Sequence, residues 1–265
     1  MKMQRAVLLT GLLATLLAGS AQAITYGTAD GTAHPYVGGL IAADWLRAGQ
    51  KDLLCSGTLI SPTVFVTAAH CTSYLESLGI SQVWVTFDPA YTSKSKLYAG
   101  HMHTNPGYPG TQSDPLDIAV ITFDEPIRGI TPARLPTAGL FDQMKANGTL
   151  ASQLFTNVGY GGQERNIGPG GPVIAYEDAR EVSVSSLDAL NPNWLRLSQN
   201  QATGDGGTCY GDSGGPQFLG AGAGETNLLV SITITGDSQC VSTNVTYRLD
   251  VPSSRAFLSQ FVFLP

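Results

Sequence analysis

Short runs in which every second residue is apolar, separated by turn-forming residues, recur along most of this sequence. In Gln82–Phe87 the side chains of Val83, Val85 and Phe87 share one face, and Leu228–Thr235 alternates over its last six residues. Alternation with a period of two in β-branched residues is typical of strands that bury one face. Turn signals lie between such runs at Asn105–Gly107, Pro109–Gly110, Asn147–Gly148 and Gly168–Pro172. The pattern therefore predicts an all-β chain.

Helical periodicity is confined to the C-terminus. Pro252 suits the first turn of a helix, and Phe257, Leu258, Phe261 and Val262 would then share one face. We expect a short C-terminal helix docked on the core.

The composition excludes several classes of protein. Apolar residues make up 43% of the 265 residues, which excludes global disorder, and charged residues make up 13%. The 31 glycines and 15 prolines suit strands joined by many turns better than helix bundles. With a net charge of −6 and a pI near 5.1, we expect neither a nucleic-acid partner nor attachment to anionic membranes.

The N-terminus has the pattern of a secretory signal. Two basic residues, Lys2 and Arg5, precede an apolar run that ends near Leu17, and the small-x-small triplet Ala21–Ala23 follows. A membrane anchor is the alternative, but the apolar run is shorter than the ~20 residues that a spanning helix needs. We therefore predict that residues 1–23 are a signal peptide. Cleavage after Ser20 instead of after Ala23 is the less favoured alternative.

Export would place the cysteines in an oxidising compartment, where disulfides form. The chain has four, Cys55, Cys71, Cys209 and Cys240, and these residues alone allow three pairings. A zinc site is disfavoured because no two of them have the short spacing of a metal-binding pair. The pair His101 and His103 is flanked by turn residues, so we expect it in a loop at the surface or beside a substrate. We expect no metal and no cofactor.

Three short segments contain residues suited to nucleophilic catalysis. Thr67–Cys71 supplies a histidine, Asp117–Val120 an aspartate, and Gly211–Pro216 a serine among glycines. A serine hydroxyl is a weak nucleophile and needs a base within hydrogen-bond reach. A carboxylate fixes the tautomer of that base, and backbone N–H groups beside the serine can stabilise an oxyanion. Each segment alone has an ordinary structural explanation, but together they predict an acyl-transfer site.

These segments resemble the trypsin/chymotrypsin-type serine proteases. The order His, Asp, Ser is that of this family, and Gly-Asp-Ser-Gly-Gly-Pro is highly specific for it. Gly159–Gly161 and Tyr247–Leu249 extend the likeness over the chain that follows the signal. The resemblance implies two packed six-stranded antiparallel Greek-key β-barrels and a short C-terminal helix. It places the domain at 24–265, with an N-terminal barrel (24–130), a connector (131–148) and a C-terminal barrel with the helix (149–265).

The resemblance also assigns roles to residues. His70 would be the general base, Asp117 its orienting acid and Ser213 the nucleophile, with the N–H groups of Gly211 and Ser213 as the oxyanion hole. Asp114 competes with Asp117, which is preferred because an apolar strand follows it. The implied disulfides are Cys55–Cys71 and Cys209–Cys240.

Activation and specificity follow by the same resemblance. A released Ile24 amine would pair with Asp212, although Ile24–Gly27 keeps only the first and last residues of the family's Ile-Val-Gly-Gly. Gly207 stands where trypsin-like members carry an aspartate, with Thr208 beside it and Gly236 and Asn244 on the other wall. We therefore predict an apolar or medium-sized residue before the cut bond rather than Arg or Lys.

The sequence thus predicts a secreted, monomeric serine endopeptidase, extracellular or periplasmic, that acts on proteins or peptides. A protein inhibitor is a second partner that the resemblance leaves open. Two alternatives remain: a protease-like binding protein without catalysis, and an esterase or narrow-target toxin with the same three residues.

Overall fold

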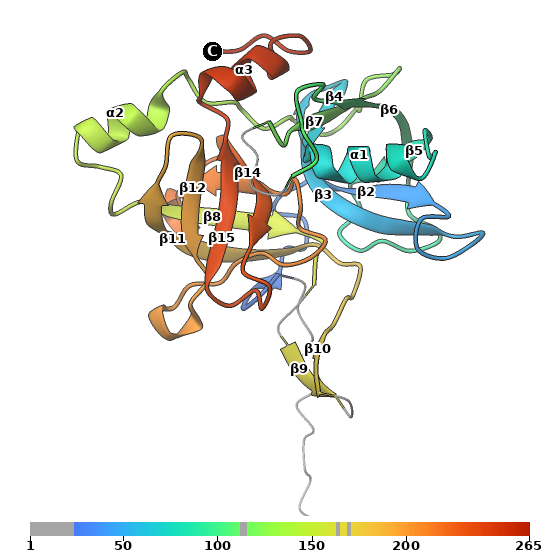
Figure 1. Ribbon diagram of the computed structural model, residues 1–265, viewed down its shortest axis with the longest axis horizontal. Coiled ribbons are helices and arrows are strands. Elements are labelled where there is room, and N and C mark those ends of the chain that lie inside the picture. Colours follow the sequence, from blue (N-terminus) through green and yellow to red (C-terminus); the bar gives the residue numbers. More distant parts are fainter. Residues whose placement is uncertain (1–23, 112–115, 163–164, 169–170) are drawn as a thin grey trace, which may run out of the picture.

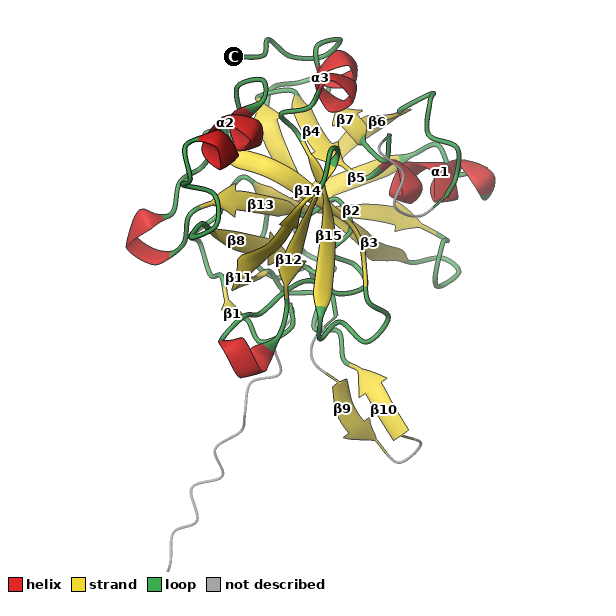
Figure 2. Ribbon diagram, turned by 60° about the vertical axis from the view of Figure 1, so that its left-hand side comes forward, coloured by secondary structure: helices red, strands yellow, loops and turns green. Residues whose placement is uncertain are grey.

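The strands pair into two closed antiparallel barrels of six strands each, and some of the paired strands lie far apart along the chain (Figure 1). The computed structural model describes residues 24–111, 116–162, 165–168 and 171–265, with only the backbone described for 165–168 and 171–173. The predicted signal peptide therefore lies outside the described residues. Figure 2 shows that strands dominate and that helices lie at the periphery, so the expected fold class is confirmed.

The first barrel has the strand order β2-β3-β4-β7-β6-β5, and pairing of β5 with β2 closes it. Its strands are β2 (Val37–Ala43), β3 (Lys51–Ser61), β4 (Val64–Thr67), β5 (Val83–Thr86), β6 (Tyr98–Thr104) and β7 (Ala119–Thr122). The alternation around Val83 holds, because Val83 and Val85 are fully buried inside this barrel. His101 and His103 lie on β6, not in the expected loop, because the turn sequence begins only after Thr104.

The second barrel has the strand order β11-β12-β15-β14-β13-β8, and β11 closes it by pairing with β8. Its strands are β8 (Leu154–Gly159), β11 (Glu181–Leu190), β12 (Trp194–Ser198), β13 (Pro216–Leu219), β14 (Leu229–Gly236) and β15 (Thr243–Arg248). The short β1 (Thr28–Ala29) adds to β11, and β9 (Arg165–Gly168) pairs with β10 (Gly171–Ile174) in a separate hairpin.

Strand β14 is buried on both faces, not on one as its alternation predicts. Its first six residues are all buried. Ile232 and Ile234 belong to an apolar cluster that also contains Val66 and Val120 of the first barrel. Ser231 and Thr233 on the other face hydrogen-bond to Gln217. Both faces are covered because one packs at the junction of the barrels and the other lies against a neighbouring strand's polar side chain.

Helix α3 (Pro252–Leu258) is the expected C-terminal helix, with proline in its first turn. Phe257 and Leu258 are buried in the cluster that joins the two barrels, and α3 lies at the top of Figure 1. Helices α1 (Ala69–Ser77) and α2 (Leu140–Ala146) were not expected from the sequence. Each has only about two turns, too few for an apolar period to repeat.

A cluster of buried charges ties the segment before β2 to the second barrel. Arg180 donates to Asp30 at 2.7 Å and to the carbonyl oxygen of Val37 at 2.9 Å. His34 lies between two carboxylates: Nδ1 contacts Asp30, and Nε2 contacts Glu225 at 2.5 Å. Burial opposes a charge on His34, but the hydrogen bonds to Asp30 and Glu225 outweigh it and raise the pKa of the imidazole. Paired in this way, buried charges can be accommodated.

None of the helices that the structure describes is long and apolar enough to cross a membrane.

Candidate active site

The register of β4 and β7 brings His70 and Asp117 together. Thr67 at the end of β4 pairs with Ala119 at the start of β7. The chain after Thr67 and the chain before Ala119 therefore leave the barrel on the same side. His70 follows in the first turn of α1, and Asp117 precedes β7 by two positions.

One carboxylate holds both the backbone and the ring of His70. Asp117 Oδ1 accepts the backbone N–H of His70 at 2.8 Å, and Oδ2 lies 2.7 Å from Nδ1. Asp117 is fully buried, whereas about a third (32%) of the His70 side chain is exposed. The contact fixes the proton on Nδ1, which leaves the lone pair of the ring on Nε2. Asp114 lies outside the described residues.

Ser213 and His70 line the same cavity, which has a volume of about 360 Å³. Ser213 follows β12 in a loop that the first barrel holds in place, since the N–H of Ser56 donates to the Ser213 carbonyl oxygen at 2.9 Å. The hydroxyl of Ser56 also donates to the carbonyl oxygen of Gly211 at 3.0 Å. One barrel thus supplies the histidine and aspartate, and the other supplies the serine.

The backbone around Ser213 leaves two donors unused. The described residues offer no acceptor to the N–H groups of Gly211 and Ser213. Gly211 has φ +96°, a conformation that glycine adopts readily, and a Cβ there would lie 3.0 Å from the Cα of Gly161. Two such donors, held by the fold, are what a developing oxyanion requires.

Asp212 is a fully buried carboxylate that no cation contacts among the described residues. It accepts backbone N–H groups from Gly161 at 2.8 Å and Cys209 at 2.9 Å. Burial outweighs these bonds and raises the pKa of Asp212 to about 7. Side chains at Gly159 or Gly161 would collide with the carboxylate, which explains the glycine-aromatic-glycine segment.

Ile24 and Thr25 pack against the loop that carries Ser213. Ile24 is fully buried, and the N–H of Gly207 donates to the carbonyl oxygen of Thr25 at 2.9 Å. Ile24 has φ +74°, a region that β-branched residues avoid. The chain that begins at Ile24 is therefore part of the site's framework.

The expected pocket residues divide into two groups. Thr208 and Gly236 line the cavity, whereas Gly207 and Asn244 do not reach its wall. The residue that the sequence did not reveal is Gln199, which is fully buried and accepts the N–H of Thr208 through Oε1. A Cβ on Gly207 would collide with the Gln199 side chain. Only the path of the chain after β12 brings Gln199 here, and no local pattern marks it.

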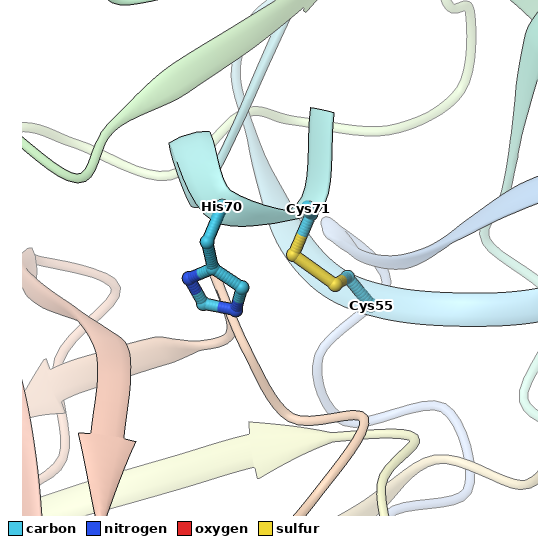
Figure 3. Close-up of side chains that lie close together, drawn as sticks. All are labelled: Cys55, His70 and Cys71. Carbon is cyan, nitrogen blue, oxygen red and sulfur yellow. A yellow bond between two sulfur atoms is a disulfide. The ribbon is translucent and has the colours of Figure 1, made fainter. Parts of the chain in front are cut away.

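The four cysteines form the disulfides Cys55–Cys71 and Cys209–Cys240, with Cα atoms 6.4 and 5.3 Å apart. This is the pairing that the resemblance implies. Figure 3 shows the first disulfide beside the ring of His70. The two sulfur atoms and the His70 ring nitrogen lie within 4.8 Å of one another, but sulfurs bonded to each other are not thiolate ligands.

Comparison with known proteins agrees with this geometry. The sequence profile of the family described as Trypsin matches residues 28–256. A protein named Trypsin from Saccharopolyspora erythraea is 27% identical over 210 residues, which are 77% of this chain and 82% of that protein. The described site lies within the matched region apart from Ile24 and Thr25. The chain thus belongs to the Trypsin family and is a serine-type endopeptidase, a hydrolase of proteins or peptides.

Proposed function

We propose that this chain is a secreted endopeptidase in which Ser213 is the nucleophile, His70 the general base and Asp117 the residue that orients it. The observation that carries the proposal is the double contact of Asp117 with His70, in a cavity that Ser213 also lines. A histidine with its proton fixed on Nδ1 can accept a proton only at Nε2.

The reaction proceeds in two balanced halves. The Oγ of Ser213 bonds to the scissile carbonyl carbon while its proton moves to His70 Nε2. That proton then passes to the leaving amine as the C–N bond breaks, which leaves an ester on Ser213. Water attacks the ester, His70 takes one of its protons and returns it to Ser213, and the acid product leaves. Asp117 stabilises the imidazolium in both halves.

The N–H groups of Gly211 and Ser213 would bind the oxyanion that forms in each half. The N–H groups of Gly162 and Gly215 donate to the carbonyl oxygens of Tyr210 and Asp212, each at 2.7 Å. These contacts support this role, because the two carbonyl groups share their peptide planes with the N–H groups of Gly211 and Ser213, and the hydrogen bonds fix those planes before substrate arrives. Loss of one donor of this type lowers kcat by roughly 10²–10³-fold in serine proteases.

Activation would follow release of Ile24 from the peptide that precedes it. The new ammonium would pair with Asp212, whose buried carboxylate has no cationic partner among the described residues. Cleavage before Ile24 would also relieve the strain of its positive φ, which costs roughly 1–3 kcal/mol. Since 1–23 has the pattern of a signal peptide, cleavage after Ala23 would produce the active N-terminus during export.

Secretion outside the cell or into a periplasm is the location we propose, with the chain acting as a monomer. The two disulfides support an oxidising compartment. A protein inhibitor would bind at the same cavity as a substrate.

A fluorophosphonate probe tests the catalytic proposal. We expect it to label Ser213 in the unmodified enzyme and not in the Ser213→Ala variant, which should fold and retain only residual activity. A folded, secreted enzyme that the probe does not label would support the non-catalytic binding protein instead. N-terminal sequencing of the secreted protein should read Ile-Thr-Tyr-Gly, and active enzyme that starts elsewhere would contradict the activation scheme.

A further inference from the structure

A second cavity, with a volume of about 510 Å³, adjoins the cavity that Ser213 lines. Tyr210 lines both cavities, and the next residue, Gly211, lines only the second. Gly211 carries one of the two N–H groups that would bind the oxyanion. The second cavity therefore opens beside the carbonyl group that reacts.

The second cavity lies on the leaving-group side of the cut bond. The leaving amine takes its proton from His70, and the Cys55–Cys71 disulfide lies beside the ring of His70 (Figure 3). Leu53 and Leu54, which precede Cys55, line the second cavity. In an extended peptide, side chains two positions apart point to the same side. When the residue before the cut bond fills the first cavity, the second residue after the cut bond thus faces the second cavity.

Three aromatic residues give this cavity surfaces that suit a cation. Tyr176 and Tyr210 are 55% and 52% exposed. Trp45 is half-buried, and its Nε1–H donates to the carbonyl oxygen of Asp52 at 3.0 Å. The ring of Tyr176 lies against Gly162, because a Cβ on that glycine would stand 3.2 Å from two of the ring carbons. Exposed aromatic rings attract cations, and the flat guanidinium group of arginine stacks on them.

Asp178 supplies a carboxylate to the same cavity. The carboxylate has no hydrogen bond or ion pair to any side chain that the structure describes. The nearby Arg47 donates instead to Asp52, at 2.8 Å from its Nε. Burial raises the pKa of Asp178, the charge of Arg47 lowers it and the charge of Asp52 raises it. A partly buried carboxylate of this kind is stabilised by a counter-charge.

The backbone holds the Asp178 carboxylate in position before a ligand arrives. The carbonyl oxygen of Asp178 accepts the N–H of Tyr91 at 2.7 Å, and Ala179 forms a β-bridge with Ala90. Asp178 has φ +52°, a conformation that aspartate and asparagine adopt more readily than other residues with a side chain. Asparagine can therefore replace Asp178 without new backbone strain.

The charges around the second cavity favour a cationic ligand. Its charged lining residues are Arg47, Asp52 and Asp178, so two carboxylates face one guanidinium group. Arg47 is already bound by Asp52, whereas Asp178 has no such partner. An anionic side chain would have to displace Asp52 from Arg47 and would lie near a second carboxylate, which is unfavourable.

We propose that this cavity selects substrates with an arginine or lysine side chain at the second position after the cut bond. The cation pairs with Asp178, and the rest of the side chain packs on Trp45, Tyr176 and Tyr210. Arginine is the better ligand of the two, because its guanidinium group also stacks on the rings. The inference rests on the proposed hydrolysis by Ser213 and names a feature of the substrate for it.

A peptide series tests this preference on the unmodified mature enzyme. Each peptide has a mixture of apolar and medium-sized residues before the cut bond, alanine after it, and then arginine, citrulline, norleucine or glutamate. Citrulline has the shape of arginine without its charge. Mass spectrometry locates the cut bond, and competition between the peptides gives the ratios of kcat/KM.

We expect arginine to exceed citrulline about fivefold in kcat/KM, as one partly exposed charge pair with an aromatic contact predicts. Norleucine should resemble citrulline, and glutamate should be the poorest. Cleavage of the citrulline, norleucine or glutamate peptide as fast as the arginine peptide overturns the inference.

Two variants that each remove one negative charge test the role of Asp178. In Asp178→Asn the ratio of kcat/KM for arginine over citrulline should fall close to one. Glu177→Gln removes the same charge from the adjacent residue, which is exposed and does not line the cavity, and should leave the ratio unchanged. An unchanged ratio in Asp178→Asn, or an equal fall in both variants, overturns the role of Asp178.

A fluorophosphonate probe separates this inference from the proposed function. It reports the fraction of competent enzyme through Ser213, without reference to residues after the cut bond. It also shows that both variants have folded. Labelled enzyme that does not prefer arginine over citrulline overturns only the inference, and enzyme that the probe does not label overturns the proposed function as well.

Discussion

Each carboxylate oxygen of Asp117 contacts His70: one contacts its backbone N–H and the other contacts Nδ1 of its ring. In Asp117→Asn the side chain keeps its shape but presents an NH₂ group to one of these donors. The ring would then turn to the wrong tautomer, and we expect kcat to fall about 10⁴-fold with little change in stability. Peptide hydrolysis and thermal unfolding measure the two effects. Asp114→Asn should leave kcat unchanged, and greater damage from that substitution would contradict the assignment.

Asp212 makes the stability of the uncleaved chain depend on pH. Its pKa of about 7 in the folded state lies above the ordinary 3.8, so the folded chain holds a proton that the unfolded chain has released. The resulting stability is complete below about pH 4 and lost as pH rises through about 7, a difference of order 4 kcal/mol. A chain that begins at Ile24 should lack this loss, because its ammonium keeps the carboxylate charged.

Melting temperatures between pH 4 and 8 test this for three proteins: the N-terminally extended chain, the chain beginning at Ile24, and the extended chain with Asp212→Asn. All three share the loss that His34 causes, so the first should lose more stability than the other two as pH rises from 4 through about 7. Identical profiles for the extended chain and the chain beginning at Ile24 would argue against an ion pair between Ile24 and Asp212.

At the level of elements, His34 joins the segment before β2 to the loop before β14. Protonated, it donates to both Asp30 and Glu225. Its raised pKa means that this stability is complete below the ordinary value of 6.5 and is lost as pH rises through the folded value. A neutral imidazole has one N–H and serves only one of the two carboxylates.

We therefore expect His34→Gln to lower the free energy of unfolding by about 1–3 kcal/mol near pH 6, and by less above the folded pKa. Urea unfolding at several pH values measures the difference. His101→Gln is the matched control, since its contact with Asp124 is largely exposed and such pairs contribute little. If the loss in the free energy of unfolding caused by His34→Gln does not vary with pH, the contribution of His34 comes from packing and not from its charge.

Elements with a repeating local pattern were predictable, and contacts between distant segments were not. The strand at Val83 and the C-terminal helix at Phe257 follow from periodicity, and the segments around His70 and Ser213 follow from motifs. The helix α1 has too few turns to show a period. The burial of both faces of β14 depends on how the barrels meet, which joins residues far apart in sequence. Gln199 lies only nine positions before Thr208, but it is placed there by a loop conformation that no residue pattern marks.

For the whole molecule, one apolar cluster joins both barrels and α3, so we expect a single unfolding transition. Phe257 is 5% exposed in that cluster. Phe257→Ala should cost about 3–5 kcal/mol and shift the transition without dividing it. Tryptophan fluorescence and far-UV circular dichroism in urea should give the same midpoint. Phe263→Ala, at a fully exposed phenylalanine nearby, should change the midpoint little, and two separate transitions would show that the barrels unfold independently.

The burial of Asn244 also bears on the host in which this enzyme can be produced. Asn244-Val245-Thr246 is an acceptor triplet for N-linked glycans, as is Asn147-Gly148-Thr149. Asn147 is exposed at the end of α2 and can carry a sugar chain without disturbing the fold. Asn244 is 1% exposed beneath the cavity, so a glycan added before folding would prevent β14 and β15 from pairing. A eukaryotic secretory host would therefore yield misfolded protein unless Thr246 is replaced, whereas bacterial export avoids the modification.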